Sequence, residues 1–472
     1  MSRTDKREPV DAPFNGKVSH EGHCFMSSSF EPVAEFVARP QVPASAREMV
    51  ALLLIDTLGV AAGATHLEPA RIARDVAVSF HAAPDAVNQA HLPFDGRVAS
   101  VPGVAFAAAT QIDNLDGHDG YNPTKGHIGC AVVPALLAFS EARPDLTSVD
   151  ALDILAMSYE VGARAAIALH RTVSDYHTSG AWNALAVAAI GCKLRNATAT
   201  QLREALGIAE YHGPRSQMMR EIANPTMLHD GSGMGALTGS MAALMALQGF
   251  QGAPAITIED EDVADVWSDL GAHWTIEKNY IKPYPVCRWA HAPLDALDIL
   301  MRKHDIAADD IARLDVRTFA ESAALFPGVP ETTSQAQYSL AFALAAMMQH
   351  RQVGPDQISG NGLTDSSVAA LLDRITITEA DIYSDRFPAR RCADVTLTLT
   401  DGRTLTSGEV DARGGPEAPL DLEEVAQKLL RFAAPVIGET RSTALWKMRA
   451  EMLDPAHKFS ELVDLVAPAP GA

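Results

Sequence analysis

The stretch that decides the fold is residues 49–63, which read MVALLLIDTLGVAAG. Its leucine and isoleucine side chains recur at the spacing of one helical face, and Gly63 follows as a helix terminator. Similar runs extend from about residue 30 to residue 275, and alanine and glycine line several of them. Because small side chains let neighbouring helices approach closely, this pattern predicts a tightly packed helical domain.

The pattern changes near residue 280. Pro283 and Pro285 interrupt the helical periodicity, and residues 314–318 and 395–399 alternate apolar and polar side chains, which is strand spacing. Helical periodicity returns at Leu420. We therefore predict a mainly α protein. It has a helical domain from residues 29–279 and 416–466, an α+β domain from residues 280–415, a flexible N-terminal lead (1–28) and a flexible tail (467–472).

The chain of 472 residues is strongly acidic. Its 38 basic and 59 acidic residues give a formal net charge of −21. Such a protein is unsuited to non-specific binding of nucleic acid or of anionic membranes, so the sequence predicts neither as a partner. A small anionic substrate would need a local cluster of Lys, Arg and His set against this global field.

The cysteines point to a reducing compartment. There are five, at positions 24, 130, 192, 287 and 392, and they are scattered without a CxxC pair. This usage is typical of free thiols rather than of a disulfide framework. Residues 1–18 also lack the apolar core of a secretory signal. We therefore expect a cytoplasmic protein.

The densest polar stretch is residues 111–127, which read QIDNLDGHDGYNPTKGH between two apolar runs. Loops held between rigid helices often carry catalytic groups, although a solvated loop would have the same composition. Aspartate and histidine alternate here, as they do in some metal sites. The spacing matches neither an EF-hand loop nor a zinc motif, so we predict no metal.

Seven landmarks occur in a defined order along the chain. They are Asp56-Thr57-Leu58-Gly59, His127-Ile128-Gly129, Tyr159-Glu160-Val161-Gly162, His177-Thr178-Ser179-Gly180, Leu228-His229-Asp230-Gly231, Lys282-Pro283-Tyr284-Pro285-Val286-Cys287 and Gln335-Ala336-Gln337-Tyr338-Ser339-Leu340. Together they resemble the MmgE/PrpD family, which includes 2-methylcitrate dehydratase, cis-aconitate decarboxylase and iminodisuccinate epimerase. The resemblance implies a large all-helical domain built from both chain ends, an inserted smaller α+β lid domain, a homodimer, and an enzyme that needs no cofactor.

The resemblance also implies a set of catalytic residues. His127 falls on the family's active-site histidine, and Asp113 or Asp116 corresponds to its active-site aspartate. Lys282 corresponds to a cation that contacts the substrate, although a surface lysine at a domain hinge would look the same. His177 is the second histidine, and an imidazole at the start of a helix suits both proton transfer and carboxylate binding.

Four further residues complete the predicted site as substrate-binding groups. Lys125 is a nearby cation that can hold a carboxylate. Arg288 follows the Lys282 segment and can form a bidentate pair with a carboxylate. His229 and Tyr338 lie on the family's Leu-His-x-Gly and Ser-Leu elements.

Two other motifs suggest different activities. Cys287 and His291 are spaced as a thiol nucleophile and its base might be, but no orienting motif accompanies them, so an inert thiol is favoured. Residues 231–235, GSGMG, resemble a nucleotide loop only loosely, because they lack the preceding strand and the trailing acidic residue. We interpret these glycines as helix-packing positions.

Two positions depart from the family's lyases: Thr226 stands where they often have a lysine, and Phe342 where they often have a tyrosine. The polar stretch looks more like that of the iminodisuccinate epimerase branch. We predict a dehydratase-type lyase that abstracts a proton alpha to a carboxylate in a small di- or tricarboxylate. The alternatives are an epimerase of an iminodisuccinate-like dicarboxylate and a non-catalytic carboxylate-binding homologue.

Overall fold

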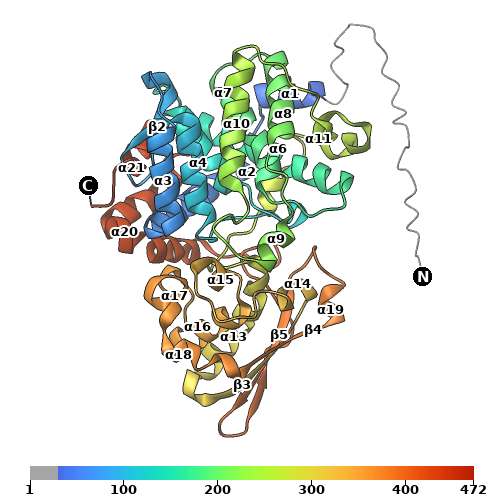
Figure 1. Cartoon of the computed structure of the whole chain (residues 1–472), viewed down its shortest axis with the longest axis vertical. Coiled ribbons are helices and arrows are strands. Elements are labelled where there is room, and N and C mark those ends of the chain that lie inside the picture. The colour runs from blue at the N-terminus through green and yellow to red at the C-terminus, as the bar shows by residue number, and fades with distance from the viewer. Residues whose placement is uncertain (1–29, 472) are drawn as a thin grey trace, which may run out of the picture.

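The computed structural model describes residues 30–471. The predicted flexible lead and Cys24 lie outside the described residues. Within them the chain forms 21 α-helices, a two-stranded sheet and a five-stranded sheet, as predicted for a mainly α protein (Figure 1). The four cysteines of the described part are free and buried.

The upper part of Figure 1 is helical, and its only strands in the described chain are the short hairpin β1–β2 (Gln89–His91 and Val98–Ser100). Its longer helices are α2 (Ala44–Gly63), α3 (Glu68–Phe80), α4 (Val101–Asp113), α5 (Gly129–Ser140), α6 (Ser148–Thr172), α7 (Gly180–Leu194), α8 (Ala199–His212), α10 (Ser232–Leu247) and α20 (Leu422–Glu451). Its shorter helices are α1 (Phe30–Ala38), α9 (Met218–Ala223), α11 (Ile256–Glu259), α12 (Ala264–Trp267) and α21 (Phe459–Val466).

The lower part contains the larger sheet and the remaining helices. Its strands are β3 (Ile311–Thr318), β4 (Ile375–Glu379), β5 (Cys392–Leu399), β6 (Thr404–Thr406) and β7 (Val410–Asp411). β3 pairs with β4 in parallel and with β5 antiparallel, and β6 and β7 both pair with β5. Its helices are α13 (His291–His304), α14 (Ala320–Ala323), α15 (Thr333–Gln337), α16 (Leu340–His350), α17 (Pro355–Ile358), α18 (Ser366–Ala369) and α19 (Asp381–Ser384).

The strands predicted from alternating side chains are present. β3 and β5 are the two central strands of the larger sheet, and the side chains at positions 314, 316, 395, 397 and 399 are all buried. The turn at Asp401-Gly402 connects β5 to β6, with Gly402 at φ +89°. A positive φ is what glycine accepts without strain, so glycine suits this turn.

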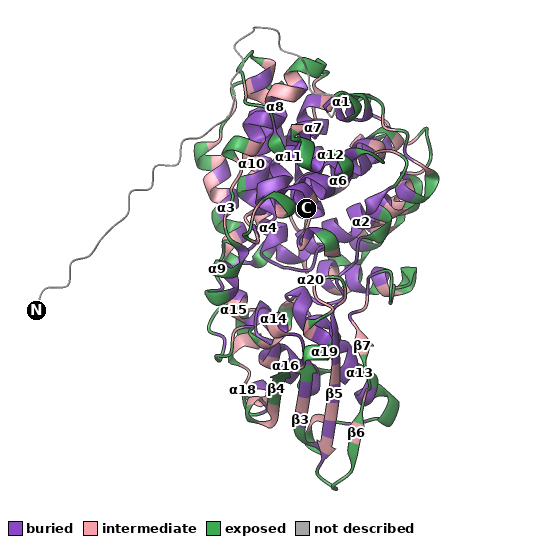
Figure 2. Cartoon of the chain, turned by 90° about the vertical axis from the view of Figure 1, so that its right-hand side faces the viewer, coloured by how far each residue is buried: buried purple, intermediate pink, exposed green. Residues whose placement is uncertain are grey.

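Helix α2 is the centre of the helical part, and Figure 2 shows this interior as mostly buried. The segment Ala44–His66 has a mean hydropathy of 1.6, and by length and composition alone it could cross a membrane. In the protein, 83% of that apolar window is buried by other helices. It is therefore placed as a core helix.

Helix α20 packs against α2, although the two helices are far apart in the sequence. Lys428 on α20 donates to Asp56 on α2 at 2.7 Å and to the Gly117 carbonyl at 2.7 Å. α20 is interrupted at Gly438, whose φ of +79° lies outside the helical region. The two ends of the described chain thus meet in the helical part, whereas a lid function for the α+β part stays a prediction.

Candidate active site

A narrow pocket lies where the helical part meets the α+β part. Its cavity is about 30 Å³. A hollow of about 640 Å³ beside α1 is larger, but its lining contains no histidine. The narrow pocket is lined by Asp116, Lys125, His127, Tyr176, Met218, Ile222, Asp230, Tyr280, Lys282, Cys287, Arg288, Trp289, Tyr338 and Arg391.

Six of the nine predicted site residues line this pocket. They are Asp116, Lys125, His127, Lys282, Arg288 and Tyr338. They come from chain positions as far apart as 116 and 338, so the fold brings them together. In the described structure, the predicted cations and the imidazole of His127 therefore line one shared cavity.

The polar loop between α4 and α5 is fixed from several sides. The Asp119 carboxylate accepts hydrogen bonds from the Tyr159 hydroxyl (3.0 Å) and the Asn279 amide (2.8 Å). The backbone of Gly120 pairs with that of Tyr280 in both directions. Because each tie comes from a different segment, the loop is a rigid support for the pocket and not the solvated loop considered from sequence.

The His127 ring has a defined tautomer. Its Nδ1 lies 2.7 Å from the Asp119 carbonyl oxygen, which can only accept, so Nδ1 carries the proton. Nε2 then offers a lone pair, and it lies 3.7 Å from Oδ2 of Asp230. Burial, and secondarily the Lys282 ammonium, lower the pKa of His127 well below its usual range. The resting imidazole is therefore neutral and able to receive a proton.

Lys282 is fully buried and forms an ion pair with Asp116. Its ammonium also donates to the Asp116 carbonyl oxygen at 3.0 Å. Burial alone would lower the pKa of Lys282. The Asp116 carboxylate has a larger opposite effect, so the pKa of Lys282 is raised. The lysine is thus a fixed positive charge in the pocket wall.

Three other cations face the pocket without a carboxylate partner among the described residues. The Arg288 guanidinium donates to the carbonyl oxygens of residues 412 and 413 and stacks over the Tyr280 ring at 4.3 Å. Arg391 donates to the Asn122 side chain and the Pro388 carbonyl. The Lys125 ammonium lies 5.5 Å from the centre of the Tyr176 ring. This concentration of positive charge, in a protein of net charge −21, suits a small polyanion.

Backbone strain collects around the same pocket. Seven non-glycine residues of the described chain have a positive φ, and three of them are Asp116, Lys125 and His229. The first two line the pocket and the third directly precedes the lining residue Asp230. Such conformations cost about 1–3 kcal/mol each and persist where the surrounding structure imposes them, often at functional sites.

Three predicted residues lie outside the lining. His177 is buried beside the pocket wall, where its backbone bridges to Gln217, and burial lowers the pKa of its ring. Asp113 accepts from the Ser232 backbone N–H at the start of α10. His229 packs behind Tyr338, with ring centres 5.7 Å apart. None of the three is placed to touch a molecule in the cavity as it stands.

Sequence reasoning missed four polar lining residues: Asp230, Tyr176, Tyr280 and Arg391. Asp230 could have been predicted from the sequence, because it directly follows His229 in the motif of residues 228–231. Arg391 gave no usable signal, since it enters the site from the segment before β5, more than 260 residues after its partner Asn122.

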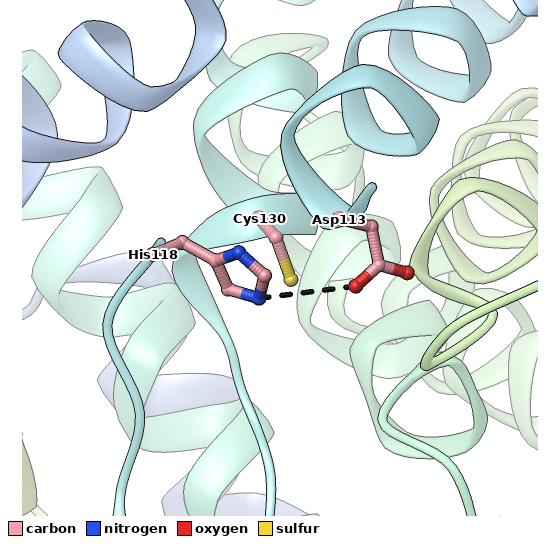
Figure 3. A group of neighbouring side chains, drawn as sticks. All are labelled: Asp113, His118 and Cys130. Carbon is pink, nitrogen blue, oxygen red and sulfur yellow. Dashed lines mark ion pairs between the residues drawn. The ribbon is translucent and has the colours of Figure 1, made fainter. Parts of the chain in front are cut away.

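A buried group of possible metal ligands lies beneath the pocket. Figure 3 shows His118, Cys130 and Asp113 turned toward one another, with His118 Nε2 and Asp113 Oδ1 3.8 Å apart. A second group joins His118 to Asp116 and His127. Two of the oxygen ligands are already engaged, by the Ser232 N–H and by the Lys282 ammonium. In the first group, the Cys130 thiol donates to the Ser232 hydroxyl and burial raises its pKa well above its usual range. In the second group, the Lys282 ammonium already supplies positive charge beside Asp116. Both features disfavour a cation, while neither ring nitrogen of His118 has a hydrogen-bond partner among the described residues.

The two motifs suggesting other activities have structural explanations. Burial raises the pKa of the Cys287 thiol to about 12, and the His291 ring donates to the Val286 carbonyl rather than to the thiol. In α10, a Cβ at Gly233 would come within 2.1 Å of Thr110, and one at Gly235 within 2.5 Å of a backbone carbonyl. The glycines are helix-packing positions, as interpreted from sequence.

Comparisons with known proteins show which family the sequence matches. Residues 32–273 match the N-terminal domain of the MmgE/PrpD family, and residues 284–452 match its C-terminal domain. Cis-aconitate decarboxylase of Mus musculus is 23% identical over 365 residues, which cover 71% of this chain and 72% of the relative. Cis-aconitate decarboxylase of Aspergillus terreus is 21% identical over 391 residues, which cover 73% of this chain and 76% of the relative.

Proposed function

Because this chain belongs to the MmgE/PrpD family, we propose that it is a cofactor-independent enzyme that removes a proton alpha to a carboxylate in a small di- or tricarboxylate. We propose further that the loss of a β-hydroxyl group follows, which makes the enzyme a dehydratase-type lyase. The relatives that it matches are named as decarboxylases, which are also lyases acting on a polycarboxylate.

One observation carries the proposal. Lys125, Arg288 and Arg391 meet around the uncharged imidazole of His127 in a buried pocket, and none of the three has a carboxylate partner among the described residues. Arg288 and Arg391 are each only 5% exposed, and unpaired cations buried to this extent are costly unless a ligand neutralises them. A molecule with two or three carboxylates supplies the missing partners.

The same groups support the chemistry. Removing a proton next to a carboxylate leaves negative charge that spreads onto the carboxylate oxygens. Preorganised cations in a site with little water stabilise that charge more than water does. Lys282 is the most firmly positioned of them, because it is fully buried and held by Asp116. His127, with its free Nε2, is placed to return the proton.

The test is incubation of citrate and cis-aconitate with the enzyme in D₂O, followed by proton NMR. We expect loss of signal at a methylene next to a carboxylate, together with appearance or loss of a vinyl proton. Exchange of neither compound, with no other small polycarboxylate turned over, would contradict the proposal. A matched sample of heat-denatured protein is the control.

A second candidate is an epimerase, and two positions favour it. Thr226 is held by Glu221, with its backbone N–H and its hydroxyl both donating to that carboxylate, and it does not line the pocket. Phe342 is buried at the start of α16. The pocket therefore lacks the lysine and the tyrosine often found in the family's lyases. Deuterium entering the substrate without any elimination is the outcome that favours the epimerase.

Treatment with a chelator such as EDTA should leave activity unchanged. The reason is that the Cys130 thiol of one candidate ligand group is protonated and donates to Ser232, and the Lys282 ammonium stands beside Asp116 of the other. Activity is measured before and after dialysis, and metal content is measured in parallel. Loss of activity that Zn²⁺ or Fe²⁺ restores would overturn the cofactor-free part of the proposal.

A further inference from the structure

Asp230 is the one pocket carboxylate that no cation of the described residues pairs with. It is 6% exposed and sits on a sharp turn between His229, at φ +47°, and Gly231, at φ +67°, just before α10 begins. The other carboxylate in the lining, Asp116, is held by the Lys282 ammonium. Asp230 is therefore the carboxylate left free to act as a base.

Ser179 fixes the orientation of this carboxylate. The Ser179 hydroxyl accepts the backbone N–H of His127 at 3.0 Å, so its own proton is directed to Asp230 Oδ2, 2.6 Å away. On the other side, the lone pair of His127 Nε2 lies 3.7 Å from the same oxygen. Oδ2 of Asp230 thus faces two groups. The Ser179 hydroxyl donates to it and fixes its position, and the His127 imidazole can accept a proton from it.

We propose that Asp230 is the base that takes the substrate's proton and that His127 then receives this proton from it. The proposal rests on the proposed function and names the residues that carry out its first step. Ser179 is a positioning residue in this scheme.

The step balances as follows. The C–H bond next to the substrate carboxylate breaks, and its electron pair stays on the carbon and spreads onto the carboxylate oxygens. The proton bonds to Asp230 Oδ2 and then passes to His127 Nε2. The pKa of His127 is low in the resting site, but the negative charge that forms on the adjacent substrate raises it in this step. The transfer restores the carboxylate and leaves an imidazolium. That imidazolium protonates either the departing hydroxyl, which leaves as water while the C–O bond breaks, or the carbon itself.

The surroundings of Asp230 set its titration. Burial raises its pKa to about 6, while the Ser179 hydrogen bond works in the opposite direction. A base in this range is well matched to proton transfer near neutral pH. The charged groups that face it are Asp113, Asp116, His127, Glu221 and Lys282. The neutral titratable groups around it are Cys130, Tyr176, Cys287 and Tyr338.

Asp230→Asn is the direct test, because the amide oxygen can still accept from Ser179. We expect deuterium exchange into citrate or cis-aconitate to fall by about 10²–10⁴-fold, while tricarballylate, the citrate analogue without the hydroxyl group, binds within a few-fold of wild type. Asp145→Asn is the matched control, because that carboxylate is 71% exposed and remote from the pocket.

The pH profile separates a catalytic from a structural role. Since Asp230 must be ionised to accept a proton, kcat/KM of the wild type should fall as the pH drops through about 6. Ser179→Ala removes a hydrogen bond that lowers the pKa of Asp230, so this acid limb should move to higher pH. Ser179→Ala also keeps the proposal testable if Asp230→Asn does not fold.

The outcomes distinguish the two proposals. Near-normal exchange by Asp230→Asn, or an acid limb that stays in place in Ser179→Ala, overturns the role of Asp230 and leaves the proposed function standing. If the wild type exchanges no proton of either compound, both proposals fall together.

Discussion

His127 is the residue on which the proposed proton transfer converges, and its environment makes its replacement informative. His127→Gln keeps a hydrogen-bond donor for the Asp119 carbonyl but removes the lone pair at Nε2. We expect turnover to fall by about 10²–10⁴-fold with little change in the melting temperature. His212→Gln, an exposed position at the end of α8, is the control. Activity within a few-fold of wild type would remove His127 from the mechanism.

The Lys282–Asp116 pair makes a separate prediction about stability. Lys282→Met leaves a buried carboxylate without its cation, and breaking a buried pair in this way costs about 3–5 kcal/mol. The double variant Lys282→Met/Asp116→Asn removes both charges, so it should regain most of the stability but not the activity. Urea unfolding and turnover of all variants are the measurements. Arg71→Ala, which breaks an exposed pair, is the control.

If the single and the double variant unfold at the same urea concentration, the two charges do not act as a pair. If the double variant turns over substrate at the wild-type rate, Lys282 is a structural residue and not part of the chemistry.

For single residues, the sequence allowed some site positions to be predicted and not others. His127, Lys282 and Lys125 were predictable because each stands in a motif or a polar stretch. His177 was one candidate for the base, beside Asp113 or Asp116, but it does not line the pocket, and its backbone forms a bridge with Gln217. Its catalytic role stays an untested prediction.

Among the elements, the loop between α4 and α5 determines where the pocket residues stand. Gly120 in this loop has no room for a side chain, because a Cβ would lie 2.3 Å from the Tyr280 hydroxyl and 2.8 Å from His127 Nδ1. Gly120→Ala should displace both rings. We expect a loss of about 1–3 kcal/mol of stability and a larger loss of activity.

Gly354→Ala is the control for this variant. It lies before α17, away from the pocket, and the nearest atom to its Cβ belongs to the flexible side chain of Gln357. Thermal unfolding and turnover of both variants check the prediction. An active, stable Gly120→Ala protein would mean that the loop tolerates movement and that its rigidity is not needed.

The elements themselves were largely predictable, and their junctions were not. The strands β3 and β5 followed from alternation, because one face of each strand is buried. Helical periodicity returns at Leu420 in the sequence, and α20 begins at Leu422. By contrast, Arg391 reaches the pocket through a contact with Asn122 across the two parts of the protein, and no local pattern encodes a contact of that range.

On the scale of the whole molecule, the pocket is too small for its proposed substrate. A cavity of about 30 Å³ holds about two water molecules, at about 10–15 Å³ each. We therefore expect the helical and α+β parts to separate when a tricarboxylate enters. Among the contacts that join them here are Arg391 with Asn122, and Gln337 with the Asn114 carbonyl at 3.0 Å.

Hydrogen exchange measured by mass spectrometry tests this opening. Tricarballylate should slow exchange in residues 120–127 and 385–391, because binding favours the closed arrangement. Asn122→Ala should speed exchange in residues 385–391 and raise KM several-fold. The hairpin β1–β2 (Gln89–His91 and Val98–Ser100) is the internal control. Exchange that is unchanged in both segments, with and without the ligand, would contradict a separation of the two parts.

The packing of α20 on α2 also bears on how the chain is made. Asp56 leaves the ribosome 372 residues before its partner Lys428. At about 5–20 residues per second, α2 waits roughly 20–70 s for α20. Throughout that delay an apolar segment hydrophobic enough to resemble a membrane anchor lacks its final cover. A nascent chain built in this order should depend on chaperones, and a fragment ending before residue 420 should aggregate when produced alone.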